Sequence, residues 1–171
     1  PGATLVLVGA RDVAPERGGA LGGSVYADVA GVEGADIPHI DLAVLPAVLD
    51  AVHAAIAAGG GAACHDVSEG GLLACLAEMG FGGDRGGELD VAGLAARADV
   101  ALGNETAGVL VCELVDGASA TALFGAVPHA VLGQTITAPE LRVRDGGRPL
   151  FSAPLAVLQA AWEAPFRAVF H

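Results

Sequence analysis

The sequence of 171 residues contains no lysine, and its 8 basic residues, all arginines, stand against 20 acidic residues. The resulting net charge of −12 repels phosphate backbones and anionic lipid surfaces. We therefore expect no nucleic-acid partner and no membrane partner. An anionic small-molecule substrate would need local help from a helix N-terminus, an arginine or a metal ion.

Cysteine is scarce as well, with only three residues in the sequence. Cys64, Cys75 and Cys112 stand apart from one another in apolar patterns and form no C-x-x-C pair. We expect buried, reduced thiols in a cytoplasmic protein. The sequence also lacks any run approaching the ~18 uncharged apolar residues of a membrane helix, and we expect no signal peptide.

The length is that of one ordinary domain, large enough to bury most of its surface on folding. The chain begins with Pro1 rather than methionine and enters the apolar run Thr4–Val8 almost at once. We therefore expect residues 1–171 to be a single domain taken from a longer multidomain chain.

The stretch from Ala62 to Leu72 changes from apolar residues to polar ones and then to a helical pattern. Ala62–Cys64 is small and apolar, which is typical of a strand buried on both faces. The spacing of Leu72, Leu76 and Met79 predicts the helix that follows. This stretch therefore predicts a strand, a turn and a helix N-terminus.

Asp66 or Ser68 is placed to cap that helix, and His65 beside them is a possible acid. Three backbone N–H groups would then point outward as an anion site, those of Glu69, Gly70 and Gly71. An ordinary capped turn that binds nothing has the same spacing. A single histidine is likewise more often structural than catalytic.

Two further segments have helical features. Ser24 is placed to cap a short helix that follows Leu21-Gly22-Gly23. The segment from Asp41 to Ala58 predicts an amphipathic helix with its apolar stripe at positions 42, 45, 49, 52 and 56. Pro46 either lies in the first turn, so that the helix begins near Leu45, or kinks that turn.

The rest of the chain predicts alternating strands and helices. Phe81–Gly87 is expected to be a mobile loop, and it lacks the Gly-Lys-Ser/Thr ending of a phosphate-binding loop. Strands are expected at 4–9, 88–91, 109–114, 127–136 and 140–144, and helices at 92–98, 117–124 and 155–163. Asp145-Gly146-Gly147 predicts a hairpin. Arg142, Arg144 and Arg148 are expected as surface charges on an edge strand.

Several of these motifs resemble those of the phosphoribosylformylglycinamidine synthases. The segment His65–Leu72 resembles their His-Asp-x-Ser-Asp-Gly-Gly-Leu motif, with Glu69 where the family often has aspartate. Leu21–Tyr26 is similar to their Leu-Gly-Gly-Ser-x-Tyr, and the turn at Asn104 and Glu105 to their Phe-x-Glu-x-x-Gly. The segment 161–166 resembles their closing Ala-Trp-Glu-x-x-Phe, so the resemblance extends over most of the chain.

The alternation of strands and helices, with hairpins, predicts an α/β fold of the α+β type, in which helices pack on a mixed sheet. The resemblance implies the C-terminal domain of the aminoimidazole ribotide synthetase superfamily, a three-layer α/β/α unit with partial ferredoxin-like topology. It also implies an ATP-dependent ligase that converts formylglycinamide ribonucleotide to the amidine. The implied partners are upstream N-terminal-type domains, a glutaminase subunit and a small bridging subunit.

The resemblance implies ATP, or a structural ADP, with Mg²⁺ as cofactor. Asp66 matches a magnesium ligand, and Ser68 matches a nucleotide-contacting serine. The phosphate contacts are expected at Ser68, Glu69, Gly70 and Gly71, with His65, Asn104 and Glu105 as secondary candidates and no catalytic residue in this chain. The chain alone is expected to be inactive. Two alternatives are a non-catalytic scaffold with a degenerate nucleotide site and another member of the superfamily.

Overall fold

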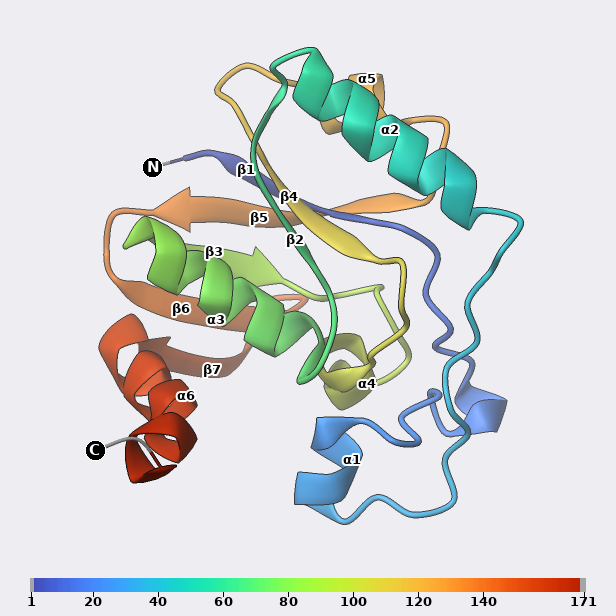
Figure 1. The fold of residues 1–171 in the computed structure, drawn as a ribbon, viewed down its shortest axis with the longest axis vertical. Coiled ribbons are helices and arrows are strands. Elements are labelled where there is room, and N and C mark those ends of the chain that lie inside the picture. Colours follow the sequence, from blue (N-terminus) through green and yellow to red (C-terminus); the bar gives the residue numbers. More distant parts are fainter. Residues whose placement is uncertain (1, 170–171) are drawn as a thin grey trace.

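The computed structural model describes residues 2–169 as one mixed seven-stranded sheet with helices on both faces (Figure 1). The strand order is β2-β4-β1-β5-β3-β6-β7, and among the described residues only β3 and β6 pair in parallel. The strands are β1 (Thr4–Val8), β2 (Gly61–Asp66), β3 (Gly86–Asp90), β4 (Leu110–Leu114), β5 (His129–Ile136), β6 (Glu140–Asp145) and β7 (Arg148–Pro154). The predicted mixed sheet is confirmed.

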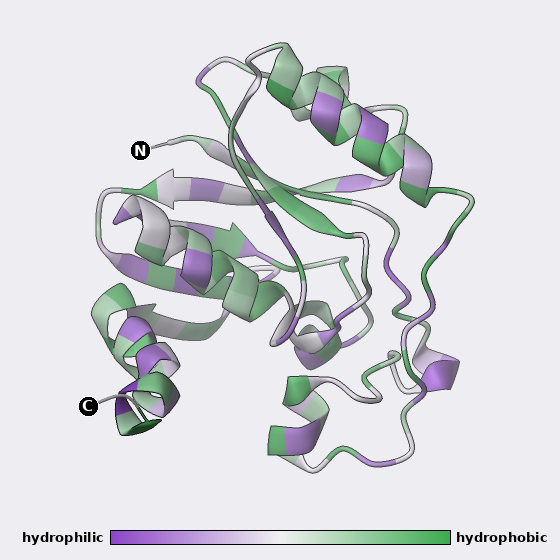
Figure 2. Cartoon of the chain, viewed as in Figure 1, coloured by the Kyte–Doolittle hydropathy of each residue, from purple (hydrophilic) through white to green (hydrophobic). Residues whose placement is uncertain are grey.

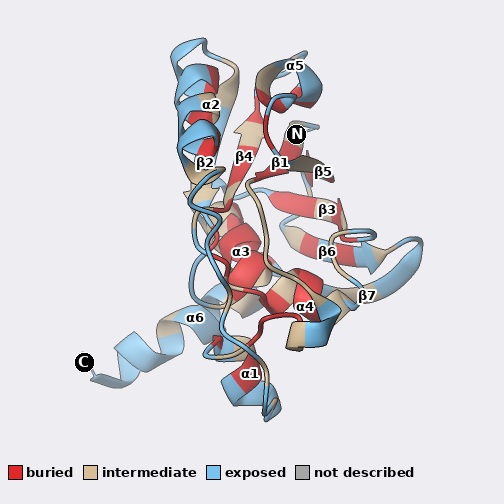
Figure 3. Cartoon of the chain, turned by 90° about the vertical axis from the view of Figure 1, so that its right-hand side faces the viewer, coloured by how far each residue is buried: buried red, intermediate tan, exposed pale blue. Residues whose placement is uncertain are grey.

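The central strand β1 separates the two cores, because its side chains alternate between the faces of the sheet. Leu5 and Leu7 pack with α3 (Gly71–Gly83), α4 (Ala98–Gly103) and α6 (Leu155–Val169). Val6 and Val8 pack with α2 (Leu45–Ala57) and α5 (Ala120–Phe124) on the other face. Figure 3 shows the buried residues concentrated between these layers. The predicted three-layer architecture is confirmed.

Helix α2 begins at Leu45 with Pro46 in its first turn, as one of the two predicted alternatives requires. Its buried residues are Val48, Val52 and Ala55, whereas Leu49 is 50% exposed, so most of the predicted stripe is wrong. The segment has few polar side chains, and Figure 2 shows apolar residues along most of the helix. Apolar periodicity therefore could not define which side faces the sheet.

The prediction that Ala62–Cys64 is buried on both faces is also wrong. These residues belong to β2, which lies at one edge of the sheet, and all of them are exposed. Small apolar side chains suit a crowded central strand, but they also suit an edge strand that has little to pack against.

The segment Phe81–Gly83, expected in a mobile loop, is the last turn of α3. Helix α3 tolerates glycine at Gly80 because α6 lies close to it, and a Cβ there would come within 2.9 Å of Leu155 Cδ2. The helix predicted at 92–98 is absent, and α4 begins at Ala98. The carboxylate of Asp90 accepts a hydrogen bond from the Ala92 N–H and holds the chain in a turn there.

Strand β6 lies between β3 and β7, so the prediction that it is an edge strand is wrong. Arg144 pairs across strands with Glu88 at 3.2 Å and Asp90 at 3.4 Å, which explains why an interior strand carries these charges. The predicted hairpin at residues 145–147 joins β6 to β7.

Two short elements complete the fold. The helix α1 (Val25–Ala30) has Ser24 as its N-cap residue. The Ser24 side chain accepts a hydrogen bond from the Ala27 N–H at 3.0 Å, so the predicted cap is confirmed. The 3₁₀ turn η1 (Pro15–Arg17) lies in the loop before it. Within residues 2–169, no helix has the length and apolar character needed to cross a membrane.

Candidate functional site

The start of α3 differs from its prediction, because neither Asp66 nor Ser68 caps the helix. Gly70 is the N-cap residue with φ 83°, and Gly71 follows with φ 67°, so two left-handed glycines turn the chain into the helix. The Gly71 N–H donates to the Ser68 carbonyl oxygen at 3.0 Å. The glycine pair is thus required by the backbone itself.

Glu105 provides the acceptor that the sequence assigned to Asp66 or Ser68. Its Oε1 accepts hydrogen bonds from the Gly70 N–H at 2.8 Å and from the Val25 N–H at 2.9 Å. A carboxylate is favoured there because both donors lie at helix N-termini. Two of the three N–H groups expected to point outward, those of Gly70 and Gly71, therefore have partners inside the chain.

Asn104, next to Glu105, is fully buried and ties three loops together. Its Nδ2 donates to the carbonyl oxygens of Asp12, Gly19 and Ala20 at 2.8, 3.1 and 3.1 Å. Its Oδ1 accepts from the N–H and the hydroxyl of Thr106. Asn104 therefore holds the loop that leads to Ser24 against the turn that carries Glu105.

Arg11 is a residue that the sequence analysis missed. Its Nη2 donates to the carbonyl oxygens of Val100 at 3.1 Å and Ala101 at 2.8 Å. Burial lowers the pKa of the guanidinium to about 10. Its Nη1 is buried and has no hydrogen-bond partner within residues 2–169. The one available signal was an arginine placed three residues after the end of an apolar strand.

His65, in β2, is connected to both α3 and α6. Its Nδ1 is 2.7 Å from the Asp66 carbonyl oxygen, and its Nε2 is 3.1 Å from Glu78 Oε2. The other oxygen of Glu78 accepts a hydrogen bond from Trp162 Nε1 at 2.8 Å. His65 thus links β2 to α3 and, through Glu78, to α6. Both of its ring nitrogens already face acceptors.

Asp66, Ser68 and Glu69 are exposed beside this framework. The Asp66 carboxylate is 71% exposed, and its Oδ1 lies 3.6 Å from His65 Nδ1. Among the described residues, no group of three or more histidine, cysteine, aspartate or glutamate side chains could hold a metal ion. Asp66 can therefore provide one ligand to a cation, but residues 2–169 alone do not form a complete metal site.

An apolar groove of about 530 Å³ adjoins the start of α1 and the start of α3. Val25 and Gly70, whose N–H groups donate to Glu105, both line it. The Tyr26 hydroxyl donates to Asp99 at 3.3 Å on its wall. The remaining lining residues are Val29, Leu73, Ala98, Leu102, Gly103, Leu150 and Phe151.

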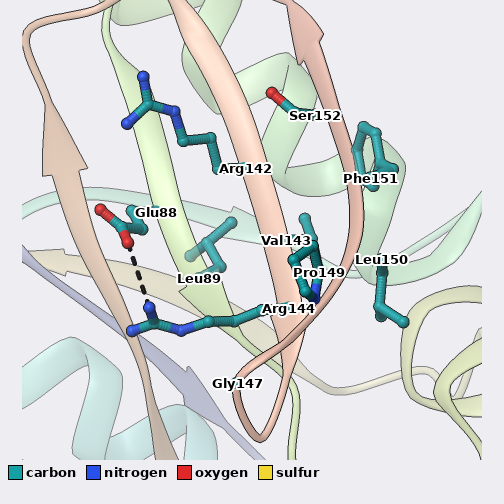
Figure 4. A pocket seen from close by; sticks show the side chains of 10 residues that line it. All are labelled: Glu88, Leu89, Arg142, Val143, Arg144, Gly147, Pro149, Leu150, Phe151 and Ser152. Carbon is teal, nitrogen blue, oxygen red and sulfur yellow. Dashed lines mark hydrogen bonds and ion pairs between the residues drawn. The ribbon is translucent and has the colours of Figure 1, made fainter.

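A second hollow, of about 360 Å³, lies over β3, β6 and β7 (Figure 4). None of the predicted site residues lines it. Its charged side chains are Glu88, Arg142 and Arg144, which form ion pairs, Arg142 with Glu140 and Arg144 with Glu88. This hollow therefore presents no uncompensated charge to a ligand.

The three cysteines differ in environment. Cys75 and Cys112 are buried as predicted, but Cys64 is exposed, so that part of the prediction is wrong. Burial raises the pKa of Cys75 to about 12. The Cys112 thiol donates to Cys64 Sγ at 3.7 Å, and this hydrogen bond lowers the pKa of Cys64.

Residues 1–146 match the family described as AIR synthase related protein, C-terminal domain. The chain is 34% identical over 175 residues to the phosphoribosylformylglycinamidine synthase subunit PurL of Deinococcus radiodurans, in a match covering 98% of this chain. It is 33% identical over 148 residues to a probable phosphoribosylformylglycinamidine synthase, chloroplastic/mitochondrial, of Arabidopsis thaliana, over 84% of this chain. The chain spans only 23% and 10% of the length of these two relatives.

Solved structures share the fold at low sequence identity. Thermotoga maritima PurL complexed with FGAR aligns with a TM-score of 0.70 and 16% identity, over 92% of this chain and 28% of that one. The hydrogenase maturation protein HypE in complex with ATP aligns with a TM-score of 0.60 and 16% identity, over 90% and 51% of the two chains. These likenesses show a common architecture.

Proposed function

The chain belongs to the AIR synthase related proteins as their C-terminal domain, and from this premise we propose that it is part of a phosphoribosylformylglycinamidine synthase. The intact enzyme converts formylglycinamide ribonucleotide to the amidine with ATP and ammonia. The observation that carries the proposal is the Glu105 carboxylate, which joins the N–H groups of Val25 and Gly70. Three segments that resemble the synthases, residues 21–26, 65–72 and 104–105, therefore meet at the Glu105 side chain.

The proposed nucleotide contacts lie on the exposed side of this junction. Asp66 supplies one oxygen ligand to Mg²⁺, and the Ser68 hydroxyl and the Glu69 N–H contact phosphate oxygens. Gly70 and Gly71 shape the turn, since their N–H groups are already used inside the chain. Mg²⁺ is commonly held by one or two carboxylates together with phosphates and water, so a single exposed aspartate fits the ion.

The chain's own residues act by positioning. ATP, or a structural ADP, binds with Mg²⁺, and ATP supplies the phosphoryl group that activates the amide oxygen. Glu105 and Asn104 hold the starts of α1 and α3 in one arrangement, so that the groups of a bound ligand meet a preformed surface. The similar fold of Thermotoga maritima PurL complexed with ATP and with ADP supports this cofactor.

The proposed partners are the protein's own N-terminal-type domains, a glutaminase subunit and a small bridging subunit. The similar fold in the structure of PurLQS from Thermotoga maritima supports such an assembly. The net charge of −12 disfavours binding to nucleic acid and to anionic membranes, and the proposed location is the cytoplasm.

A second candidate is a scaffold domain whose nucleotide site is degenerate. It is favoured by the internal use of the Gly70 and Gly71 N–H groups, which leaves fewer donors for phosphate. Another superfamily member is a third candidate, because HypE shares the fold. The match of His65–Leu72 to the synthase motif favours the first candidate.

The experiment that tests the proposal is titration of the full-length protein with Mg-ATP and Mg-ADP by calorimetry. We expect Asp66→Asn to weaken nucleotide binding about tenfold, because an amide is a poorer ligand for Mg²⁺ than a carboxylate. Asp116→Asn, at another exposed aspartate, is the matched control and should leave binding unchanged. Equal affinity in parent and Asp66→Asn would favour the scaffold.

A further inference from the structure

Cys64 and Cys112 are directly opposed on neighbouring antiparallel strands. Cys64 in β2 pairs in register with Cys112 in β4, and their sulfur atoms are 3.7 Å apart. Directly opposed residues of antiparallel strands have Cα atoms about 4.5 to 5.5 Å apart. A disulfide spans Cα separations of about 4.4 to 6.8 Å. The backbone therefore already has a spacing at which a disulfide can close.

The two thiols differ in access. Cys64 is exposed on the edge strand β2, whereas Cys112 is 3% exposed and packs beneath α2 with Val48 and Val52. A small oxidant in solution therefore meets Cys64 first. Cys112, in contact with that sulfur, is in position to react next. The third cysteine, Cys75, is buried in the core on the other face of the sheet, where its thiol donates to the His65 carbonyl oxygen at 4.0 Å.

We propose that Cys64 and Cys112 are a peroxide-sensitive dithiol that closes into a disulfide between β2 and β4. Cys64 Sγ attacks one oxygen of hydrogen peroxide, so that an S–O bond forms and the O–O bond breaks, and the departing hydroxide takes the thiol proton of Cys64 and leaves as water. Cys112 Sγ then attacks the Cys64 sulfenic acid. The S–S bond forms, the S–O bond breaks, and the thiol proton leaves with the hydroxyl as a second water.

The overall reaction oxidises two thiols by two electrons and reduces one peroxide to two waters. The product joins the edge strand covalently to its neighbour one residue before His65. Because a cross-link restricts the unfolded chain, the oxidised protein is expected to be more resistant to unfolding. This site does not depend on the proposed ligase function.

The test uses the full-length protein, reduced and then treated with a small excess of hydrogen peroxide. Free thiols are blocked with N-ethylmaleimide, and the digest is analysed by mass spectrometry. We expect a Cys64–Cys112 linked peptide that reductant removes. Cys112→Ala should instead leave a Cys64 sulfenic acid that dimedone traps, and Cys64→Ala should leave Cys112 unmodified.

Cys75→Ala is the matched control and should retain the linked peptide in full. Three results would overturn the proposal. They are a Cys64 that resists peroxide, a sulfenic acid that persists in the parent while Cys112 stays free, and a Cys64 disulfide to any other cysteine or protein molecule.

Discussion

Trp162 Nε1 donates a hydrogen bond of 2.8 Å to Glu78 Oε1, and this bond ties α6 to α3. Glu78 uses its other oxygen for His65 Nε2 at 3.1 Å. The closing Trp-Glu motif and the His-Asp motif, far apart in sequence, are therefore connected by one carboxylate. The Trp162 ring also lies 6.0 Å from the Phe81 ring, measured between centroids.

This relationship predicts a graded response to substitution. Trp162→Phe keeps an aromatic ring beside Phe81 but loses the N–H donor, so we expect a loss of about 1 kcal/mol in the free energy of unfolding. Glu78→Ala removes the partner of both Trp162 and His65 and should cost more. Urea denaturation of the chain measures both. Trp162→Phe and Glu78→Ala with identical, negligible effects would show that the bond contributes nothing.

A second prediction concerns Glu105. Glu105→Ala leaves the Val25 and Gly70 N–H groups without their acceptor, so we expect a loss of about 2 kcal/mol and faster hydrogen exchange at both amides. Glu105→Gln keeps an oxygen acceptor and should retain most of the stability. Glu33→Ala, at an exposed glutamate, is the control. If Glu105→Ala leaves both amides as protected as in the parent, the bridging role is wrong.

Local features of the fold could be predicted from the sequence. The cap at Ser24, the start of α2 at Leu45 with Pro46 in its first turn, and the hairpin at residues 145–147 are each determined by a few adjacent residues. Burial could not be predicted in the same way. The edge position of β2 and the buried side of α2 depend on strand order and helix packing, which apolar patterns in an alanine-rich chain do not encode.

In the candidate site too, features set by adjacent residues could be predicted and features set by tertiary packing could not. The strand, turn and helix start within residues 62–72 could be predicted from spacing, but the cap expected from Asp66 or Ser68 was wrong. The acceptor of the Gly70 N–H could not be predicted, since Glu105 lies 35 residues away and reaches Gly70 only through tertiary packing. The buried Arg11 was missed for the same reason, because its carbonyl partners are in α4.

A third prediction concerns salt. The net charge of −12 implies repulsion among exposed carboxylates, whereas the arginine ion pairs on the surface each contribute about 0–1 kcal/mol. Salt weakens both effects, but repulsion involves more charges, so Tm should rise with added KCl. Most of the rise is expected by about 0.1 M, where the screening length is near 10 Å. A Tm that is flat or falls over this range would contradict the prediction.

A fourth prediction concerns acid. Asp90 Oδ1 accepts hydrogen bonds from the Gly146 N–H at 2.9 Å and the Ala92 N–H at 3.0 Å. These bonds, more than the nearby Arg144, lower the pKa of Asp90 below its usual value. A carboxyl with a lowered pKa in the folded state stabilises the fold above its unfolded pKa of about 3.9. That contribution is lost as the pH falls below about 4 and through the folded pKa.

The substitution Asp90→Asn tests the direction of this pH dependence of stability. The amide oxygen can still accept both N–H groups, but it gains no stabilisation from ionisation, so the variant should be less stable than the parent at pH 7. The difference should shrink as the pH falls below about 4, because the parent carboxyl then becomes neutral too. Urea denaturation of both proteins at pH 7 and pH 3 measures the difference. A stability difference of the same size at both pH values would mean that Asp90 acts through packing, with its ionisation contributing nothing.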